Sequence, residues 1–446
     1  MNRRALLTTA FAAALALAFL GARPRPVRFP SAPAATGPTF SNEVVRIFQQ
    51  HCQNCHHTGG VAPFALQSFS DARLHAPEIK LMTQTRKMPP WKPVTSCAEF
   101  DGERVMSQAE IDTIAKWVDA GAPEGDRAQM PPRVEFPAAE WGLGREPDLV
   151  LSYPEAYTPP ANGDMYRCFT IPTNLDSDRY VAAIDVLPGN PQTVHHVIAY
   201  IDTGDESVKL DERDPGPGYT SFGGPGFSIV DPTSATLGGW APGAQPVVLP
   251  DGVAMSLPAK SRVVLQVHYH PHEANPQPDR TRIGIYFAKV KPTKLLRILP
   301  LINQNFTIPP GNPNYQVVAG ITVPFFVDLH LWEIAPHMHL LGRRMSVQAS
   351  TPGSPTQCLI NIDDWDFNWQ GLYRYKEPVA IPRGTTLSLF AYFDNSENNL
   401  RNPNIPPQPV SWGESTTDEM CIAFLGVTLD QENLAKTGKL DTSWMR

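Results

Sequence analysis

Apolar residues recur at helical spacing in the first third of the chain. Two groups show it: Val44, Val45, Ile47 and Phe48, and then Ile111, Ile114, Ala115, Trp117 and Val118. Apolar positions three and four residues apart predict amphipathic helices. Ser107 followed by Glu110 is the pattern of a capping box that opens the last helix, and Gly121 before Pro123 ends it. Residues 40–126 are therefore predicted to be mainly helical.

Beyond residue 126 the pattern changes to short apolar segments separated by proline and polar turns. Residues 181–186, 262–268 and 386–393 are the clearest of these segments. The chain holds 47 prolines, and proline blocks helix interiors and removes a backbone donor. The larger part of the chain is therefore predicted to consist of strands and long loops.

The N-terminus reads Asn2-Arg3-Arg4 and continues in a nearly unbroken apolar run over residues 5–22. A charged start before an apolar stretch is typical of an export signal, so residues 1–30 are predicted to be a signal peptide. An uncleaved N-terminal membrane anchor is the alternative. Either way the protein is expected to be periplasmic or secreted in a bacterium, with membrane contact only through an uncleaved segment.

The composition of the chain limits the classes of molecule that it is expected to bind. The chain has 446 residues, enough for about three domains. A net charge of -7 with 18% charged residues provides no basic field for nucleic acid, so none is expected as a partner. Small molecules and redox proteins remain as the expected partners.

Residues 52–56 read Cys-Gln-Asn-Cys-His and carry the first chemical signal. Two thiols at this spacing followed by histidine form the attachment motif of haem c, with Cys52 and Cys55 bonded to the haem and His56 as axial ligand. Met88, in a loop stiffened by two prolines, is predicted to be the second axial ligand, with Met82 and Met106 as alternatives. One covalent haem c is expected, in a helix-haem-helix arrangement.

Four cysteines remain once the haem pair is removed: Cys97, Cys168, Cys358 and Cys421. Four cysteines allow three pairings. We weakly favour pairing Cys97 with Cys168 and Cys358 with Cys421, although the sequence leaves the choice open.

Histidines beyond residue 126 fall into groups. These are His195 with His196, then His268, His270 and His272, then His337 with His339, while His330 stands alone. Imidazole clusters suit copper or zinc. His337 and His339 are two residues apart and would share a strand face, whereas the adjacent His195 and His196 would point to opposite faces unless their strand bends. Buried, hydrogen-bonded core histidines are the alternative for any single group.

Short motifs that occur in the same order along the chain resemble those of two known kinds of domain. Residues 62–64, 88–91 and 117–123 resemble the cytochrome domains that precede bacterial copper monooxygenases. The later motifs resemble the type II copper, ascorbate-dependent monooxygenases, a family that includes peptidylglycine alpha-hydroxylating and dopamine beta-hydroxylating enzymes. They are residues 165–168, 194–197, 265–269, 336–343 and 418–421.

The resemblance implies two copper ions. His195, His196 and His268 would hold the electron-storing copper. His337, His339 and Met420 would hold the catalytic copper, where two imidazoles and a thioether favour Cu(I) and leave a position open for dioxygen. His270 is kept as an alternate ligand or a residue that supports one.

The fold class implied is multidomain. An N-terminal all-α cytochrome c domain over residues 38–128 would be followed by two all-β jelly-roll-like sandwich domains, over residues 140–292 and 293–446, with one copper each. In this family the coppers face each other across an open, solvent-filled cleft between the sandwiches.

The substrate is expected to differ from that of the peptide hydroxylases. Where those enzymes hold a substrate carboxylate with a basic residue, a polar residue and a tyrosine, this chain has Ala335, Ile422 and Phe424. Because three apolar side chains cannot hold an anion, a small apolar or aromatic substrate is expected.

The sequence therefore predicts a copper type II monooxygenase that hydroxylates a C–H bond with dioxygen. Electrons would come from an external donor, an ascorbate-like reductant or a redox protein, through the haem. A non-catalytic periplasmic haem and copper electron-transfer or copper-binding protein is the alternative, and a zinc hydrolase is a third reading.

Overall fold

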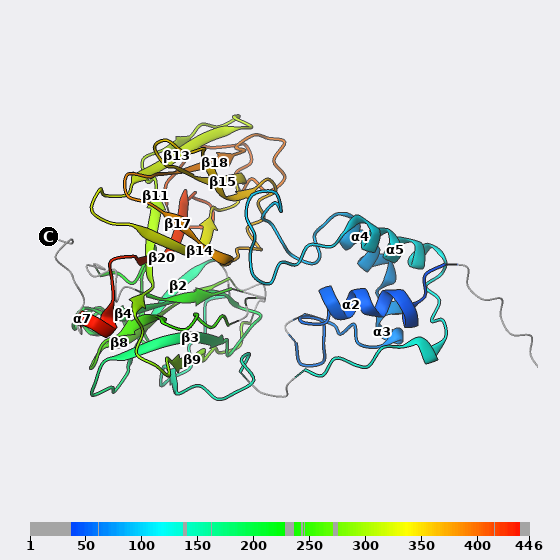
Figure 1. Ribbon diagram of the computed structural model, residues 1–446, viewed down its shortest axis with the longest axis horizontal. Coiled ribbons are helices and arrows are strands. Elements are labelled where there is room, and N and C mark those ends of the chain that lie inside the picture. The colour runs from blue at the N-terminus through cyan, green and yellow to red at the C-terminus, as the bar shows by residue number, and fades with distance from the viewer. Residues whose placement is uncertain are drawn as a thin grey trace, which may run out of the picture.

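The computed structural model describes residues 37–60, 62–136, 141–161, 163–227, 236–241, 244, 246–270, 275–413 and 415–437. A helical module (residues 40–129) lies beside two β-modules, the first over residues 149–287 and the second over residues 294–429 (Figure 1). The predicted signal peptide and His272 lie outside the described residues. Within those residues, no helix combines the length and the apolar character that a membrane span requires.

The helical module packs four short α-helices around aromatic residues. Its elements are η1 (Phe40–Val44), α2 (Val45–His51), α3 (Phe69–Leu74), α4 (Ala76–Gln84), α5 (Gln108–Asp119) and η2 (Arg127–Gln129). Phe40, Phe48 and Trp117 are fully buried at its centre. The predicted capping box is confirmed, because the Ser107 hydroxyl and the Glu110 side chain each bond to the backbone N–H of the other residue.

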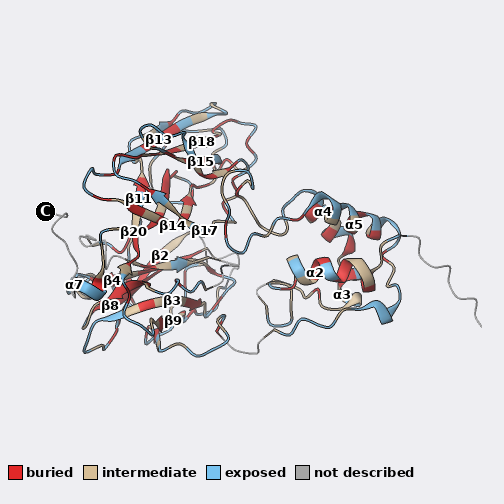
Figure 2. Ribbon diagram, in the orientation of Figure 1, coloured by how far each residue is buried: buried red, intermediate tan, exposed pale blue. Residues whose placement is uncertain are grey.

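The first β-module consists of two five-stranded sheets. Its elements are β1 (Leu149–Ser152), β2 (Met165–Pro172), β3 (Arg179–Leu187), β4 (Val194–Asp202), α6 (Glu206–Asp211), β5 (Tyr219–Thr220), β6 (Thr236–Trp240), β7 (Val253–Leu257), β8 (Arg262–Tyr269) and β9 (Arg282–Phe287). The sheet orders are β1-β9-β3-β7-β10 and β5-β2-β8-β4-β6, in which β10 (Lys294–Leu295) comes from the start of the second β-module. Both sheets contribute to one apolar core, and Figure 2 shows buried residues along β3, β4, β8 and β9.

The second β-module has two four-stranded sheets, ordered β11-β20-β14-β17 and β13-β18-β15-β16, and the pair β12-β19. Its elements are β10 (Lys294–Leu295), β11 (Arg297–Ile302), β12 (Thr307–Ile308), β13 (Tyr315–Thr322), β14 (Leu329–His337), β15 (Gly342–Ser350), β16 (Gln357–Ile362), β17 (Tyr373–Ile381), β18 (Thr386–Phe393), β19 (Val410–Ser411), β20 (Ile422–Leu429) and α7 (Leu434–Thr437). These strands enclose a second core. The strands predicted around residues 181–186, 262–268 and 386–393 are present as β3, β8 and β18.

The two β-modules contact each other directly. β10 pairs in parallel with β7 of the first module, and Ile298 and Trp332 of the second module pack against the first core. The Arg374 guanidinium of β17 also donates to the Val248 carbonyl. The inner sheets, which carry the histidine groups, are thereby held next to each other.

The disulfide preference from the sequence was wrong. Cys97 is bonded to Cys358, whereas Cys168 and Cys421 are free and buried. Cys97 lies in the loop between α4 and α5, which leaves the helical module and reaches β16 of the second β-module (Figure 1). The bond therefore links two modules, an arrangement that sequence order does not reveal.

Candidate metal centres

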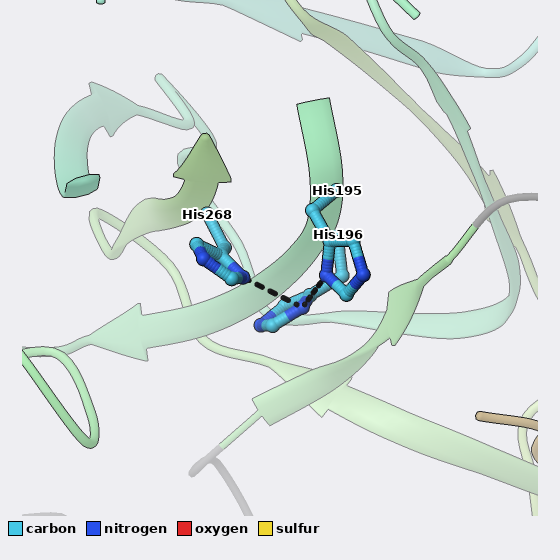
Figure 3. Close-up of side chains that lie close together, drawn as sticks. All are labelled: His195, His196 and His268. Atoms are coloured by element: carbon cyan, nitrogen blue, oxygen red, sulfur yellow. Dashed lines mark hydrogen bonds between the residues drawn. The ribbon is translucent and has the colours of Figure 1, made fainter. Parts of the chain in front are cut away.

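The first histidine group converges at one point on the inner sheet of the first β-module. His195 and His196 lie on β4 and His268 lies on the neighbouring strand β8. The Nδ1 atoms of His195 and His196 are 3.1 Å apart, and those of His196 and His268 are 3.4 Å apart (Figure 3). Three imidazole nitrogens this close form a ready set of metal ligands.

A bulge explains how adjacent histidines face the same way. The pairing of β4 with β8 shifts register between Val194 and His196, and such a bulge bends the strand and turns a side chain. The bent strand on which the sequence prediction depended is therefore present.

Burial keeps these imidazoles neutral, as a metal ligand must be. It lowers the pKa of His195 to about 3, with a further lowering from His268, and it lowers the pKa of His196 well below its usual value. The His268 ring stacks on Tyr166, with centroids 4.1 Å apart.

Asp164 supports this group and was missed by the sequence prediction. Its carboxylate accepts a hydrogen bond from His268 Nε2 at 3.2 Å, which leaves His268 Nδ1 directed at the other histidines. The same oxygen pairs with His270 Nδ1, so His270 shares a carboxylate with a ligand and lies beside the three-histidine group. Asp164 immediately precedes β2 and has no histidine near it in sequence, so no local pattern marks it.

The second histidine group lies at the end of β14. The Nε2 atoms of His337 and His339 are 3.3 Å apart. Their other nitrogens are engaged, since His337 Nδ1 donates to the Gln370 side-chain oxygen and His339 Nδ1 donates to the Asp418 carbonyl at 3.1 Å. Burial lowers the pKa of His337 to about 4 and that of His339 to about 3. Both Nε2 atoms are therefore available for one ion.

A buried carboxylate ties Met420 to this group. Glu419 accepts hydrogen bonds from the backbone N–H groups of His339 at 2.9 Å, Leu341 at 2.6 Å and Met420 at 3.2 Å. Burial raises the pKa of Glu419 to about 8, while these backbone hydrogen bonds oppose the rise because they stabilise the ionised form. The methionine segment and the His-x-His segment are thus held by one side chain, although residues 339 and 419 are far apart in sequence.

Phe367 lies between the two groups. Its ring stacks on His195 with centroids 5.2 Å apart and an interplanar angle of 15°, and it meets the His339 ring nearly perpendicularly at 5.9 Å. The resemblance implied an open, solvent-filled cleft between the sites. At these residues the structure differs, because a buried aromatic side chain contacts a ligand from each site.

The haem motif occupies a single turn after α2. The N–H groups of Cys55 and His56 both bond to the Cys52 carbonyl, and both thiols are free. His56 Nδ1 donates to the Phe64 carbonyl at 3.0 Å, which leaves Nε2 available as an axial ligand. These are the donors that covalent haem attachment would use, and the haem itself stays a prediction. Met88 lies beyond the end of α4, and its pairing with His56 across a haem stays a prediction.

Residues 294–428 match the model of a known family, the copper type II ascorbate-dependent monooxygenase, C-terminal domain. This segment contains His337, His339 and Met420. The comparisons support a copper type II monooxygenase. Copper is therefore the metal that the family implies for this chain.

The relatives are distant. Human DBH-like monooxygenase protein 1 is 23% identical over 312 residues, which cover 64% of this chain and 49% of that protein. Peptidyl-glycine alpha-amidating monooxygenase B of Xenopus laevis is 26% identical over 279 residues, covering 61% and 29%. The chain thus spans about half the length of these relatives or less. Among solved structures, the major capsid protein P2 of bacteriophage PM2 aligns over 65% of this chain and 98% of its own, at 10% identity. The TM-score of 0.26 is too low to indicate a shared fold.

Proposed function

We propose that this protein is an exported monooxygenase that hydroxylates a C–H bond of a small apolar or aromatic substrate with dioxygen, using two copper ions and one haem c. The observation that supports this proposal is that both histidine groups contact Phe367. The group on β4 and β8 brings Nδ1 atoms together, and the group at the end of β14 brings Nε2 atoms together. Bound copper supplies one-electron redox chemistry and a place for dioxygen to bind.

The chain's own residues give the two sites different roles. His195, His196 and His268 offer three imidazoles, a closed set suited to holding an electron. His337 and His339 offer two imidazoles, and Met420, whose backbone N–H shares the Glu419 carboxylate with that of His339, would add a thioether. This softer, less complete set suits Cu(I). Gln370 and Glu419 fix the second set, so its geometry does not depend on the metal alone.

The apolar positions beside His337 support the substrate class. Ile422 pairs with His337 across β14 and β20, and Phe424 pairs with Ala335 in the same register. Residues two apart on a strand share a face, so Ala335 lies on the face of His337 and Phe424 on that of Ile422. A substrate bound at this face meets apolar side chains, which favours an apolar or aromatic compound over a peptide carboxylate.

The helical module is proposed to be a cytochrome c domain, and the β-modules to be jelly-roll-like sandwiches with one copper each. Cys52, Cys55 and His56 would hold haem c, which would supply one-electron redox chemistry between the copper sites and an external reductant or redox protein. Export is supported by the disulfide between Cys97 and Cys358, since disulfides persist outside the reducing cytoplasm.

Copper loading, oxygen uptake and product formation together test this function. The wild-type protein should bind two copper ions and consume dioxygen with a hydroxylated aromatic or aliphatic product. Met420→Leu should lose Cu(I) affinity at one site and lose hydroxylation, while the haem absorbance stays unchanged. Met345→Leu is the matched control, because Met345 is also buried in the same module but lies in its apolar core. Full copper loading without oxygen uptake across a broad substrate panel would instead indicate an electron-transfer protein.

A further inference from the structure

The loop between α4 and α5 leaves the helical module and packs into the second β-module (Figure 1). We call residues 91–101 of this loop the strap. Trp91 and Phe100 pack against the core of the second β-module. Their ring centroids lie 5.4 Å and 5.6 Å from that of Tyr373 on β17. The strap thus places aromatic side chains of one module inside another.

Polar and covalent contacts fix the strap along its length. The Val94 N–H donates to the Asn361 carbonyl at 2.9 Å, and the Asp101 N–H donates to the Arg374 carbonyl at 2.8 Å. Between these two points the Cys97–Cys358 disulfide joins the strap to β16. A loop that served only as a linker would not need contacts with two strands of another module and a covalent bond.

The start of the strap lies beside the segment that contacts residues of both histidine groups. The Lys92 ammonium, on a largely buried side chain, lies 3.0 Å from the Asp364 carboxylate. Asp364 belongs to residues 363–370, which directly follow β16. In the same segment the Trp365 indole N–H donates to the His339 carbonyl at 3.2 Å, and Phe367 contacts His195 and His339.

The same end of the strap, where Lys92 lies, is close in sequence to the predicted haem ligand. Met88, the predicted second axial ligand, is three residues before Trp91. The Trp91 indole N–H is buried without a hydrogen-bond partner, an arrangement that disfavours tryptophan relative to phenylalanine at a site chosen for packing alone. Trp91 therefore packs here at the cost of one unsatisfied polar atom.

We propose that the strap and residues 363–370 form a built-in docking contact, which holds the haem-bearing module against the segment that contacts ligands of both copper sites. The inference rests on the proposed function. In the transfer that it serves, ferrous haem loses one electron and becomes ferric, and Cu(II) gains that electron and becomes Cu(I), with no proton or further reactant. The electron thus enters the copper pair inside one chain.

Stopped-flow absorbance on the full-length protein tests this contact. The protein is loaded with haem and Cu(II), its haem is reduced by one equivalent without oxygen, and haem oxidation is followed. In the wild type the reaction should be first order and independent of protein concentration. The double variant Cys97→Ser with Cys358→Ser should slow it by about tenfold, since a loosened module meets its site only as a tethered partner. Lys92→Ala should slow it by a smaller factor, because the Asp364 carboxylate that pairs with Lys92 is largely exposed.

The matched controls are Thr95→Ala and Ser96→Ala, because both residues are exposed on the same strap. Small-angle scattering provides a second readout, which should show a larger radius for the double variant and no change for the controls. Wild-type rates in both strap variants, or a wild-type rate that depends on protein concentration, would overturn the inference alone. A purified wild type that lacks haem or copper would overturn the proposed function, and the inference with it.

Discussion

Replacing Glu419 by glutamine should loosen the second copper site while leaving the first intact. One carboxylate oxygen of Glu419 accepts from the N–H groups of His339 and Met420, and the other accepts from Leu341. Glutamine retains one acceptor oxygen and turns an NH₂ group toward the remaining donors. At least one buried backbone N–H is then left facing another donor.

The size of the expected change in Cu(I) affinity follows from the loss of this hydrogen-bond acceptor. Leaving a buried N–H without its acceptor costs about 1–3 kcal/mol, and about 1.4 kcal/mol corresponds to a tenfold change in a binding constant. Because the affected groups belong to His339 and Met420 or to the turn next to them, the strain falls on the ligands themselves. We expect roughly tenfold weaker Cu(I) binding at the second site for Glu419→Gln.

Competition with a Cu(I) chelator, resolved into two binding events, measures this effect. Glu333→Gln is the control, because Glu333 is also buried in the second β-module and pairs with Arg374 at 3.1 Å, away from the ligands. It should lower the free energy of unfolding without changing either copper affinity. Wild-type affinity at both sites in Glu419→Gln, or an equal loss in the control, would refute the reasoning.

Three further predictions address the remaining contacts. Burial raises the pKa of the Cys168 and Cys421 thiols to about 12, so iodoacetamide at pH 8 should label them only after denaturation, and rapid labelling of the native protein would contradict this. Asp164→Asn should weaken copper binding at the first site by about 10–100-fold, the usual effect of removing a carboxylate behind a histidine ligand, with unchanged affinity at the second site in the same titration. Phe367→Leu should broaden the Cu(II)–Cu(II) distance distribution measured by pulsed EPR while copper content stays at two ions, and an unchanged distribution would exclude a role in fixing the sites.

Features that depend on residues close together in sequence could be predicted from the sequence alone. The capping box of Ser107 and Glu110 depends on residues three apart, so the sequence contains all of it. The position of β8 follows from its own run of apolar residues. The convergence of His195 with His196 was different, because the bulge exists only in the pairing of β4 with β8. No pattern within one strand specifies it.

The cysteine pairing failed for a related reason. The sequence-based preference paired Cys97 with Cys168 and Cys358 with Cys421, each cysteine with the next of the four along the chain, while Cys97 belongs to a strap that leaves its own module. The destination of that strap is set by the burial of Trp91 and Phe100 in a core built by residues more than two hundred positions later. Sequence spacing carries no information about such a contact.

The choice of ring nitrogen in the two sites follows from groups that the sequence did not mark. Asp164 engages His268 Nε2 and leaves Nδ1 for the metal, whereas Gln370 and the Asp418 carbonyl engage the Nδ1 atoms of the second pair and leave Nε2. Nδ1 lies closer to the backbone than Nε2 does. An ion bound through Nδ1 is therefore held against its sheet, and one bound through Nε2 stands farther out. Under the proposed function, that difference would give a rigid site suited to storing an electron and a more projecting site able to meet dioxygen and substrate, although both use the same residue type.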